Sequence, residues 1–252
     1  MALAALSTAY SFLKAVLNMN ELVVSGQAGD GREQKLVEHV VKTAEKGNPS
    51  SVISAIDEYA KNTSWLMNIG DDKGPILDAA LQKYNHTVVL ELGTFCGYSA
   101  VRMAAHMLAP GSKILSFEMS ADNCRIARQI IDHAGLSSKV DVVEGKFEDR
   151  VDVAKQFLKE MKAPFFDFVF IDHWKNRYLG DYLLLKENGL IGDGSGICAD
   201  NMGPISWAND FKKYIKTHPE ELTDTVEYRS KLEYMRWIPD SVMVSTFKRT
   251  SQ

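Results

Sequence analysis

The chain is organised around residues 165–175, which read Phe165-Phe166-Asp167-Phe168-Val169-Phe170-Ile171-Asp172-His173-Trp174-Lys175. The first seven residues are almost continuously apolar, which is typical of a strand covered on both faces of a sheet. This strand delivers a carboxylate, an imidazole, an indole and an amine at its C-terminal end. In open α/β sheets that end is where ligands bind.

A second apolar segment ends in the same way, because Gly196-Ile197-Cys198-Ala199 is followed by Asp200 and Asn201. Two strand ends therefore offer three oxygen ligands, which are Asp172, Asp200 and Asn201. Such a set suits a hard divalent cation such as Mg²⁺ better than zinc. Lys175 follows closely enough to serve as a base beside that cation.

Composition indicates one domain and excludes some partners. The 252 residues are 45% hydrophobic, which suffices for a single sizeable core, and the net charge of −4 gives no sign of a nucleic-acid footprint. The cysteines Cys96, Cys124 and Cys198 form no CxxC motif. We therefore expect a reducing compartment and no structural disulfide.

The first 17 residues are moderately apolar, but they lack a basic leading segment and are interrupted by Lys14. They are too short and too polar for a membrane span, so we expect a packed or frayed helix, with a weak targeting segment as the alternative. Residues 25–31, which are rich in glycine, read as a linker. We expect an N-terminal extension over 1–34 and one domain over 35–252, whose first helices form part of the cover of the substrate and cofactor.

Strand and helix patterns alternate along the rest of the chain. The pattern predicts a Rossmann-like doubly wound sheet of about seven strands, mostly parallel, with helices on both faces. Residues 223–234 and 241–247, on either side of Ile238-Pro239-Asp240, predict an antiparallel hairpin at one edge. The other strands are expected at 88–90, 114–117, 140–143, 165–171 and 196–199, and the helices at 33–47, 50–62, 73–84, 98–108, 121–134, 152–161 and 177–187.

A glycine loop follows the first strand, in the segment Leu90-Glu91-Leu92-Gly93-Thr94-Phe95-Cys96-Gly97-Tyr98-Ser99. Its glycines permit a tight turn and a close approach of a ligand, although the spacing is not the dinucleotide GxGxxG. A plain turn remains the alternative to a nucleoside site. Glu118 ends the next strand, where an acidic side chain typically binds a ribose diol. Gly145-Lys146-Phe147-Glu148 ends the third strand and is expected beside the adenine.

Several of these segments closely resemble the catechol O-methyltransferase family, a cation-dependent class I family that uses S-adenosylmethionine. The resemblance extends from about residue 35 to residue 248, and Asp172-His173-Trp174-Lys175 together with Leu232-Glu233-Tyr234 is its most specific part. The segments that carry it are 65–74, 90–103, 171–179, 199–201 and 232–234.

The resemblance implies Mg²⁺-dependent methyl transfer from S-adenosylmethionine to one hydroxyl of a catechol. It makes Asp172, Asp200 and Asn201 the metal ligands, Lys175 the general base and Glu233 the residue that holds the other hydroxyl. The implied cofactor-binding residues are Ile69, Glu91, Gly93, Phe95, Gly97, Tyr98, Ser99, Glu118, Met119, Phe147, Glu148, Asp172, His173 and Trp174. The implied substrate-binding residues are Trp65, Met67, Trp174, Lys175, Asn201, Pro204 and Glu233.

The chain departs from the family pattern at three places. Lys146-Phe147-Glu148 stands where the family usually has Ala-Ser-Gln, and Glu148 accepts hydrogen bonds but cannot donate one as glutamine does. The loop from Met202 to Trp207 differs from the family's substrate gate, and Phe95 replaces a common tyrosine. The substituents that the substrate carries are therefore left open.

Other functions remain as alternatives. A cation-dependent methyltransferase acting on caffeoyl-type or other vicinal diols would use a similar metal site, and a non-catalytic protein could retain the scaffold. A nicotinamide oxidoreductase is disfavoured by the missing GxGxxG. We expect a cytoplasmic protein that acts on a small molecule as a monomer, without a nucleic-acid partner or a membrane span.

Overall fold

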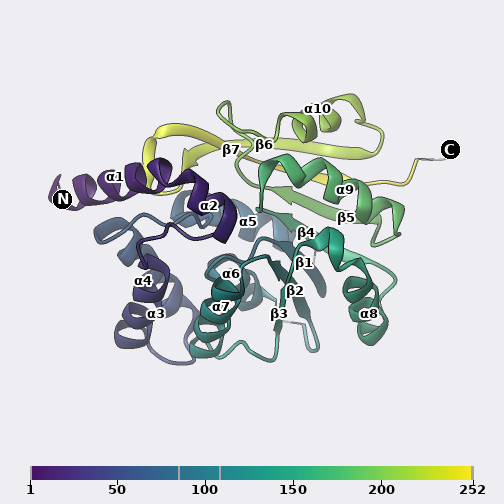
Figure 1. Cartoon of the computed structure of the whole chain (residues 1–252). Helices are drawn as coiled ribbons and strands as arrows, with labels where there is room; N and C mark the ends of the chain where they lie inside the picture. The colour runs from purple at the N-terminus through teal and green to yellow at the C-terminus, as the bar shows by residue number, and fades with distance from the viewer. Residues whose placement is uncertain (1, 85, 108, 251–252) are drawn as a thin grey trace.

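A seven-stranded sheet in the order β3-β2-β1-β4-β5-β7-β6 forms the centre of the molecule (Figure 1). The computed structural model describes residues 2–84, 86–107 and 109–250. The pairs among β3, β2, β1, β4 and β5 are parallel, whereas β7 is antiparallel to both β5 and β6. The predicted mixed, doubly wound sheet is therefore confirmed. The strands are β1 Val88–Leu92, β2 Lys113–Glu118, β3 Val140–Glu144, β4 Phe166–Ile171, β5 Ile191–Ala199, β6 Leu222–Leu232 and β7 Met235–Phe247.

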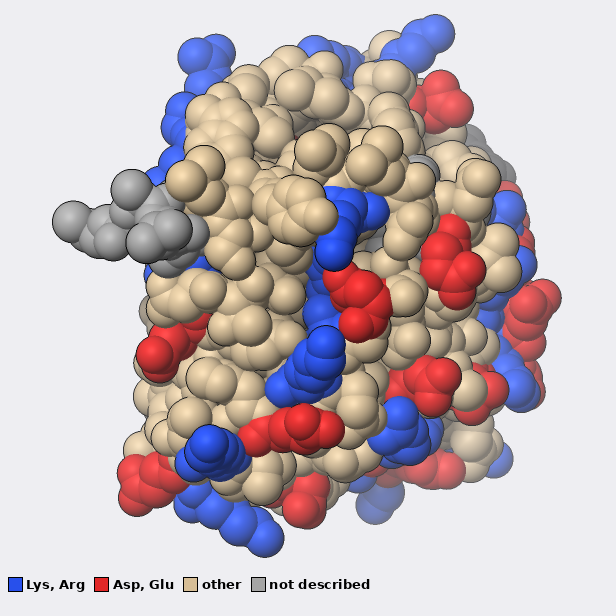
Figure 2. Space-filling view, turned by 60° about the vertical axis from the view of Figure 1, so that its left-hand side comes forward, with Lys and Arg blue, Asp and Glu red and all other residues tan. Residues whose placement is uncertain are grey.

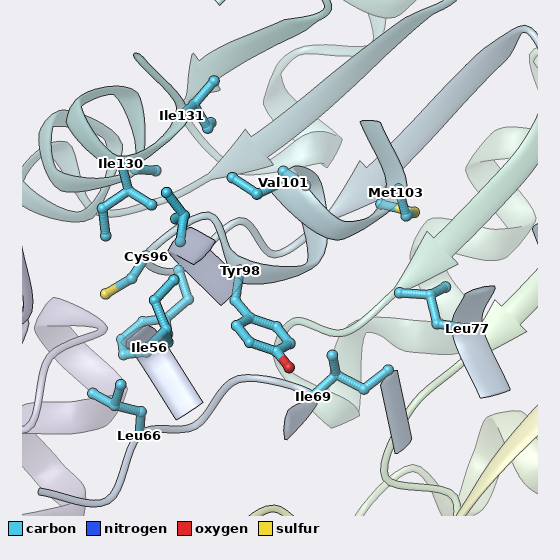
Figure 3. Packing of buried hydrophobic residues seen from close by; sticks show 14 of the residues in the cluster. Ile56, Leu66, Ile69, Leu77, Cys96, Tyr98, Val101, Met103, Ile130 and Ile131 are labelled. Atoms are coloured by element: carbon cyan, nitrogen blue, oxygen red, sulfur yellow. The ribbon is translucent and has the colours of Figure 1, made fainter. Parts of the chain in front are cut away.

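Helices cover both faces of the sheet, and each face has its own apolar core. One core lies under α3 Arg32–Thr43, α4 Pro49–Asn62, α5 Gly70–Tyr84, α6 Tyr98–His106 and α7 Ala121–His133. Figure 3 shows part of it, where Tyr98, Ile69 and Leu66 gather between the helices and the sheet. The other core lies under α8 Val151–Met161, α9 Tyr178–Glu187 and α10 Asn209–Thr217.

The sequence pattern did not predict α10, although its apolar residues follow a helical period. Phe211 and Ile215 are buried and Tyr214 packs against the same core, so one apolar face of the helix packs against the sheet. All three cysteines are free and buried, as predicted; Cys96 follows β1, Cys124 lies on α7 and Cys198 on β5.

The C-terminal hairpin differs from the prediction in where it turns. The structure ends β6 at Leu232 and starts β7 at Met235, so Glu233 and Tyr234 form the turn, and Tyr234 has a φ of 58°. The segment that we expected as the connection, 238–240, instead lies within β7, where Pro239 pairs with Lys231. A proline is tolerated there because β7 pairs with β5 only at residues 243–246. At Pro239 no β5 carbonyl requires a backbone N–H donor, so the missing N–H costs no hydrogen bond to β5.

The N-terminal segment forms two helices, α1 Ala2–Leu17 and α2 Met19–Ser25, and α1 packs on α4 (Figure 1). α1 is held by its polar side chains, because the Thr8 hydroxyl donates to the carbonyls of Ala60 and Lys61 at the end of α4. Within the ranges given above, the structure has no helix of the length and apolarity that a membrane crossing requires.

The buried side chain of His86 makes the stability of the fold depend on pH. Its ring stacks between Tyr84 and Phe168, with centroids 5.0 and 4.8 Å away, and neither ring nitrogen has a hydrogen-bond partner among the residues that the structure describes. Burial lowers the pKa of His86 from 6.5 to about 4, against a smaller opposing effect of Asp167. Between these two pH values the unfolded chain binds a proton that the folded chain does not, so stability falls as the pH falls through this window.

We predict that His86→Phe removes this sensitivity. The native chain should lose about 3 kcal/mol of unfolding free energy through His86 as the pH falls from 6.5 to 4, since one pKa unit corresponds to about 1.4 kcal/mol. Urea unfolding of both proteins at several pH values measures the effect. Equal slopes of stability against pH for the variant and the native chain would contradict the assignment.

Candidate active site

The carboxyl ends of four parallel strands meet at one edge of the sheet and are tied together by their backbones. The N–H of Asp172 donates to the carbonyl of Leu92, and the N–H of Asp200 donates to the carbonyl of Ile171, at 2.9 and 3.1 Å. Gly93 N–H donates to the carbonyl of Phe117 in the same manner. Residues that follow β1, β2, β4 and β5 are therefore held in a fixed mutual arrangement.

The glycine loop after β1 requires glycine at its first position. Gly93 has a φ of +102°, and a Cβ there would lie 2.4 Å from the carbonyl oxygen of Asp172. Glu118, at the end of β2, accepts hydrogen bonds from the N–H groups of Phe95 at 2.8 Å and Ser120 at 2.9 Å. Burial raises the pKa of Glu118, and these backbone donors partly offset it. The carboxylate is thus fixed by the loop that surrounds it.

Glu91 is wholly buried beneath this loop. Ser116 donates to Glu91 Oε2, while Glu91 Oε1 has no hydrogen-bond partner within the described residues. Burial raises the pKa of Glu91 to about 7, and the hydrogen bond from Ser116 opposes the rise. Glu91 does not line the cavity described next, so its relation to a cofactor stays a prediction.

A cavity of about 850 Å³ opens along the strand ends. This volume falls in the range of small-molecule sites. Most residues that the sequence predicted for cofactor, metal and substrate line it together, although they come from all parts of the chain. These are Trp65, Met67, Gly93, Phe95, Ser99, Glu118, Met119, Phe147, Glu148, Asp172, His173, Trp174, Lys175, Asn201 and Glu233.

The remaining predicted residues lie outside the cavity wall, and they are Ile69, Glu91, Gly97, Tyr98, Asp200 and Pro204. Gly97 starts α6 with a φ of 86°, and the Tyr98 hydroxyl donates to Asp57 at 3.2 Å. Pro204 is exposed, while its neighbours Ile205 and Trp207 line the mouth. Their predicted roles in binding stay predictions.

Two side chains at the expected adenine end have partners that the sequence did not suggest. His173 Nε2 lies 2.6 Å from Asp181 Oδ2, and its ring stacks on Tyr178. Glu148 forms an ion pair with Arg177, so the acceptor that stands in the place of the family's glutamine is neutralised by a neighbouring guanidinium.

A fully buried lysine, Lys73, is the centre of the charged end of the cavity. Its Nζ lies 2.8 Å from Asp200 Oδ2, 2.9 Å from Glu233 Oε2 and 2.7 Å from Asp240 Oδ2. Burial by itself would lower the pKa of Lys73, but the surrounding carboxylates hold it well above its ordinary value. Lys73 is therefore an ammonium group that orients three carboxylates.

The sequence indicated neither Lys73 nor Asp240 as part of the site. The separations of Lys73 from its partners along the chain are 127, 160 and 167 residues, so no local pattern marks the contacts. Asp240 was interpreted as a turn residue. The only available signal was that Lys73 falls inside the segment 65–74 that carries the family resemblance.

Asp172, Asp200 and Asn201 fit the binding of a hard cation. Asp200 Oδ1 is buried and has no hydrogen-bond partner in the described part of the chain, while Lys73 holds the other oxygen. Asn201 donates its amide group to Asp240 Oδ2 at 2.9 Å, which leaves the carbonyl oxygen as the ligand atom. No cluster of three or more His, Cys, Asp or Glu side chains suited to a metal occurs in the described part of the chain. The candidate set therefore depends on the amide of Asn201.

Lys175 lies on the other side of Asp172 and is fixed at two points. Its Nζ is 2.9 Å from Asp172 Oδ1 and 2.9 Å from the hydroxyl of Tyr178. The Tyr178 hydroxyl in turn donates to the carbonyl oxygen of Asp200 at 3.2 Å, so it accepts from Lys175. The amine is thereby held between the two strand ends.

The charges in this end of the cavity do not cancel. The four carboxyl groups of Asp172, Asp200, Glu233 and Asp240 have two ammonium partners, Lys73 and Lys175. Burial raises the pKa of Asp200 well above its ordinary value, although Lys73 opposes the rise. With all four groups ionised, the formal excess of two negative charges in a largely buried space is unfavourable unless a cation compensates it. A divalent cation has the charge that this site lacks.

Comparison with known proteins agrees with this geometry. The O-methyltransferase family matches residues 45–207. Catechol O-methyltransferase of Mus musculus is 42% identical over 208 residues, which are 82% of this chain and 76% of that protein. Catechol O-methyltransferase of Bos taurus is 40% identical over 208 residues, or 82% and 74% of the two chains.

Two solved structures share the fold. The O-methyltransferase from Bacillus cereus, in complex with SAH, has a TM-score of 0.60 and 20% identity and covers 97% of this chain and 100% of its own. The Streptomyces achromogenes enzyme of tomaymycin synthesis, in complex with SAM, has a TM-score of 0.62 and 16% identity over 79% and 90% of the chains. These structures confirm the predicted fold.

We predict that Lys73→Met destabilises the protein by about 3–5 kcal/mol, because removal of one partner leaves buried carboxylates uncompensated. Urea unfolding without added metal measures the loss.

The matched control is Lys61→Met, which removes a half-exposed partner of Asp71 and should cost less than about 1 kcal/mol. Equal stabilities of the two variants would show that the Lys73 cluster does not support the fold.

Proposed function

The chain belongs to the O-methyltransferase family, and we propose that it transfers a methyl group from S-adenosylmethionine to one hydroxyl of a catechol in a Mg²⁺-dependent reaction. The observation that carries the proposal is the buried excess of two negative charges around Asp172, Asp200, Glu233 and Asp240. A divalent cation balances that excess, and a vicinal diol offers two adjacent oxygens to such a cation.

A phenol needs activation before it can accept a methyl group, since its ordinary pKa is near 10. Mg²⁺ bound by Asp172, Asp200 and Asn201 would supply Lewis-acid stabilisation of the developing oxyanion, on the order of several kcal/mol. The ligand atoms are already oriented, because Lys73 holds Asp200 and Asp240 holds the amide of Asn201. Little reorganisation is therefore required when the cation binds.

Lys175 is the base in this proposal. Its role would be to take the proton from the hydroxyl that the bound cation acidifies. The Tyr178 hydroxyl and Asp172 hold Nζ at 2.9 Å each, so the amine has one fixed position at the strand ends. Proton transfer to a positioned group typically contributes about 10²–10⁴-fold to the rate.

Glu233 is proposed to hold the second hydroxyl. Its carboxylate lines the cavity, and Oε2 is kept in place by Lys73 at 2.9 Å and by the amide of Asn201 at 3.4 Å. A carboxylate fixed in this way accepts a hydrogen bond without losing conformational freedom on binding. The diol would then be oriented by Glu233 and by the metal ligands together.

The donor is proposed to occupy the other end of the cavity. Glu118 would accept from its ribose hydroxyls, Gly93 and Ser99 would surround the methionine portion, and His173 and Trp174 would flank the adenine. The cavity wall between the two ends includes Trp65 and Trp174, which exclude water from the transfer.

The first test is a methyl-transfer assay with labelled S-adenosylmethionine and catechol, run with Mg²⁺ and then with excess EDTA. Methylation that needs the metal, together with none of a monophenol, is the expected result. Cofactor binding without turnover of catechol would point instead to another vicinal diol or to a non-catalytic scaffold.

We predict that Lys175→Ala lowers kcat by about 10²–10⁴-fold and leaves the affinity for the methyl donor nearly unchanged, because the base acts on the substrate hydroxyl. Steady-state kinetics and calorimetry with the donor measure the two quantities. Lys155→Ala, at an exposed position on α8, is the control. A near-native kcat for the Lys175 variant would exclude it as the base.

We predict that Asp200→Ala abolishes the methyltransferase activity, and that added Mg²⁺ no longer stimulates the variant. Calorimetric titration with Mg²⁺ alone should show at least about a tenfold weaker affinity than the native chain, since one of the charged ligands is lost. Undiminished Mg²⁺ affinity would remove Asp200 from the ligand set.

A further inference from the structure

The N-terminal helix α1 forms one wall of the cavity, although it precedes the residues that match the family. Phe12, Ala15 and Val16 line the cavity from this helix, whereas the family match begins at residue 45. These three residues share one face of α1, because positions three and four apart lie together on a helix. α1 therefore lies before the segments whose sequence carries the family resemblance.

α1 is joined firmly to the substrate side of the cavity through the segment that contains Trp65. The N–H of Trp65 donates to the hydroxyl of Ser11 at 3.1 Å. Arg32 donates to the carbonyl oxygens of both Ser11 and Trp65, at 3.0 and 2.7 Å. The guanidinium is buried, and so these bonds are protected from competition by water.

The apolar face of α1 also contacts the Trp65 ring directly. Phe12 meets it edge to face, with ring centroids 5.0 Å apart and planes inclined by 75°. The indole N–H of Trp65 donates to the backbone carbonyl of Glu233 at 2.9 Å. A chain of contacts thus runs from α1 through Trp65 to the residue proposed to hold the substrate.

The opposite side of this part of the cavity is lined mostly by uncharged residues from the loop after β5 and from the hairpin, which are Ile205, Ser206, Trp207, Leu232, Ile238 and Pro239. The hairpin also contributes the carboxylates of Glu233 and Asp240, and both are paired with Lys73. Phe12, Leu232 and Ile238 pack against the same core. The remaining charged lining residues belong to the strand ends and the adenosine side, so the mouth beyond the Lys73 cluster is a mainly apolar channel.

The mouth opens to solvent at both of its sides. Val16 is 41% exposed, and Ile205 and Trp207 are 65% and 63% exposed. Figure 2 views the molecule from the side where α1 lies in Figure 1, and uncharged residues cover a broad part of this face. A substituent on the catechol ring can therefore extend along apolar side chains toward the surface.

We propose that α1 sets the substrate class: the enzyme takes catechols that carry an extended, uncharged apolar substituent, and Phe12 and Val16 are the residues that select it. The inference rests on the proposed function. Apolar substituents gain free energy by leaving water for this channel, whereas a cationic substituent would lose hydration there, because the nearby carboxylates of Glu233 and Asp240 are already paired with Lys73.

The test compares kcat/KM for catechol, 4-butylcatechol and a catechol with a 3-aminopropyl chain of similar length. The native enzyme should prefer the butyl over the aminopropyl compound by at least about tenfold, since differences of this size follow from one or two buried methylenes. Equal kcat/KM values for these two compounds would overturn the proposal.

Phe12→Ala should lower kcat/KM for 4-butylcatechol about tenfold more than for catechol, with the change appearing in KM rather than in kcat. Leu13→Ala is the matched control, because Leu13 lies on the same helix, is 52% exposed and does not line the cavity. A uniform loss for all three substrates, or a loss in kcat alone, would indicate a merely structural role and overturn the proposal.

Val16→Glu provides a second variant at an exposed position, where folding is not at risk. It should shift the preference by about tenfold or more toward the aminopropyl compound, because it places a carboxylate beside the substituent. An unchanged preference would overturn the proposal. Methylation of catechol itself distinguishes failure of the proposed function from failure of the role of α1. If no catechol is methylated, the proposed function fails as well. If catechols are methylated without discrimination between substituents, only the role of α1 is refuted.

Discussion

The charged site depends on one ammonium group, that of Lys73, because it joins parts of the chain that are remote from one another. Asp200 follows β5, Glu233 lies in the β6–β7 turn and Asp240 lies within β7, and all three meet Nζ on α5. Without a cation at their centre these carboxylates would repel one another in a space from which water is excluded. The same contact therefore fixes the hairpin against the parallel strands and gives the proposed metal ligand Asp200 its orientation.

The substrate side of the cavity has two chemically different ends, and Trp65 links them. One end concentrates carboxylates, where a small excess of negative charge favours a divalent cation. The other is an apolar channel to which α1 and the hairpin contribute. Trp65 contacts both, since Phe12 packs on its ring and its indole N–H reaches the Glu233 carbonyl. Activation of the hydroxyl and selection of the substituent are thus assigned to separate surfaces that share one rigid connection.

Local patterns predicted the parallel strands, their flanking helices and the cavity residues at the strand ends, because strand ends of a doubly wound sheet gather at one edge. Other lining residues, such as Trp65, Met67 and Glu233, were implied by the resemblance to the family. Local patterns failed where structure depends on distant contacts. Pro239 read as a turn, but the missing pairing partner on one side of β7 makes it an acceptable strand residue. Nothing near Lys73 indicated its burial, whereas α10 was overlooked despite the helical spacing of Phe211, Tyr214 and Ile215.

The three buried cysteines can report local unfolding of the protein, because each becomes reactive only when its surroundings open. Burial raises the pKa of Cys124 to about 12 and the pKa values of Cys96 and Cys198 well above their ordinary range, and all three side chains are fully shielded from solvent. Alkylating reagents attack the thiolate, so none of the three reacts in the closed state. Cys96 lies in the glycine loop, Cys124 on α7 and Cys198 two residues before Asp200. The labelling rate of each cysteine would therefore measure how often its own segment opens: the glycine loop for Cys96, α7 for Cys124 and β5 for Cys198. The three rates can be measured in one chain without any substitution.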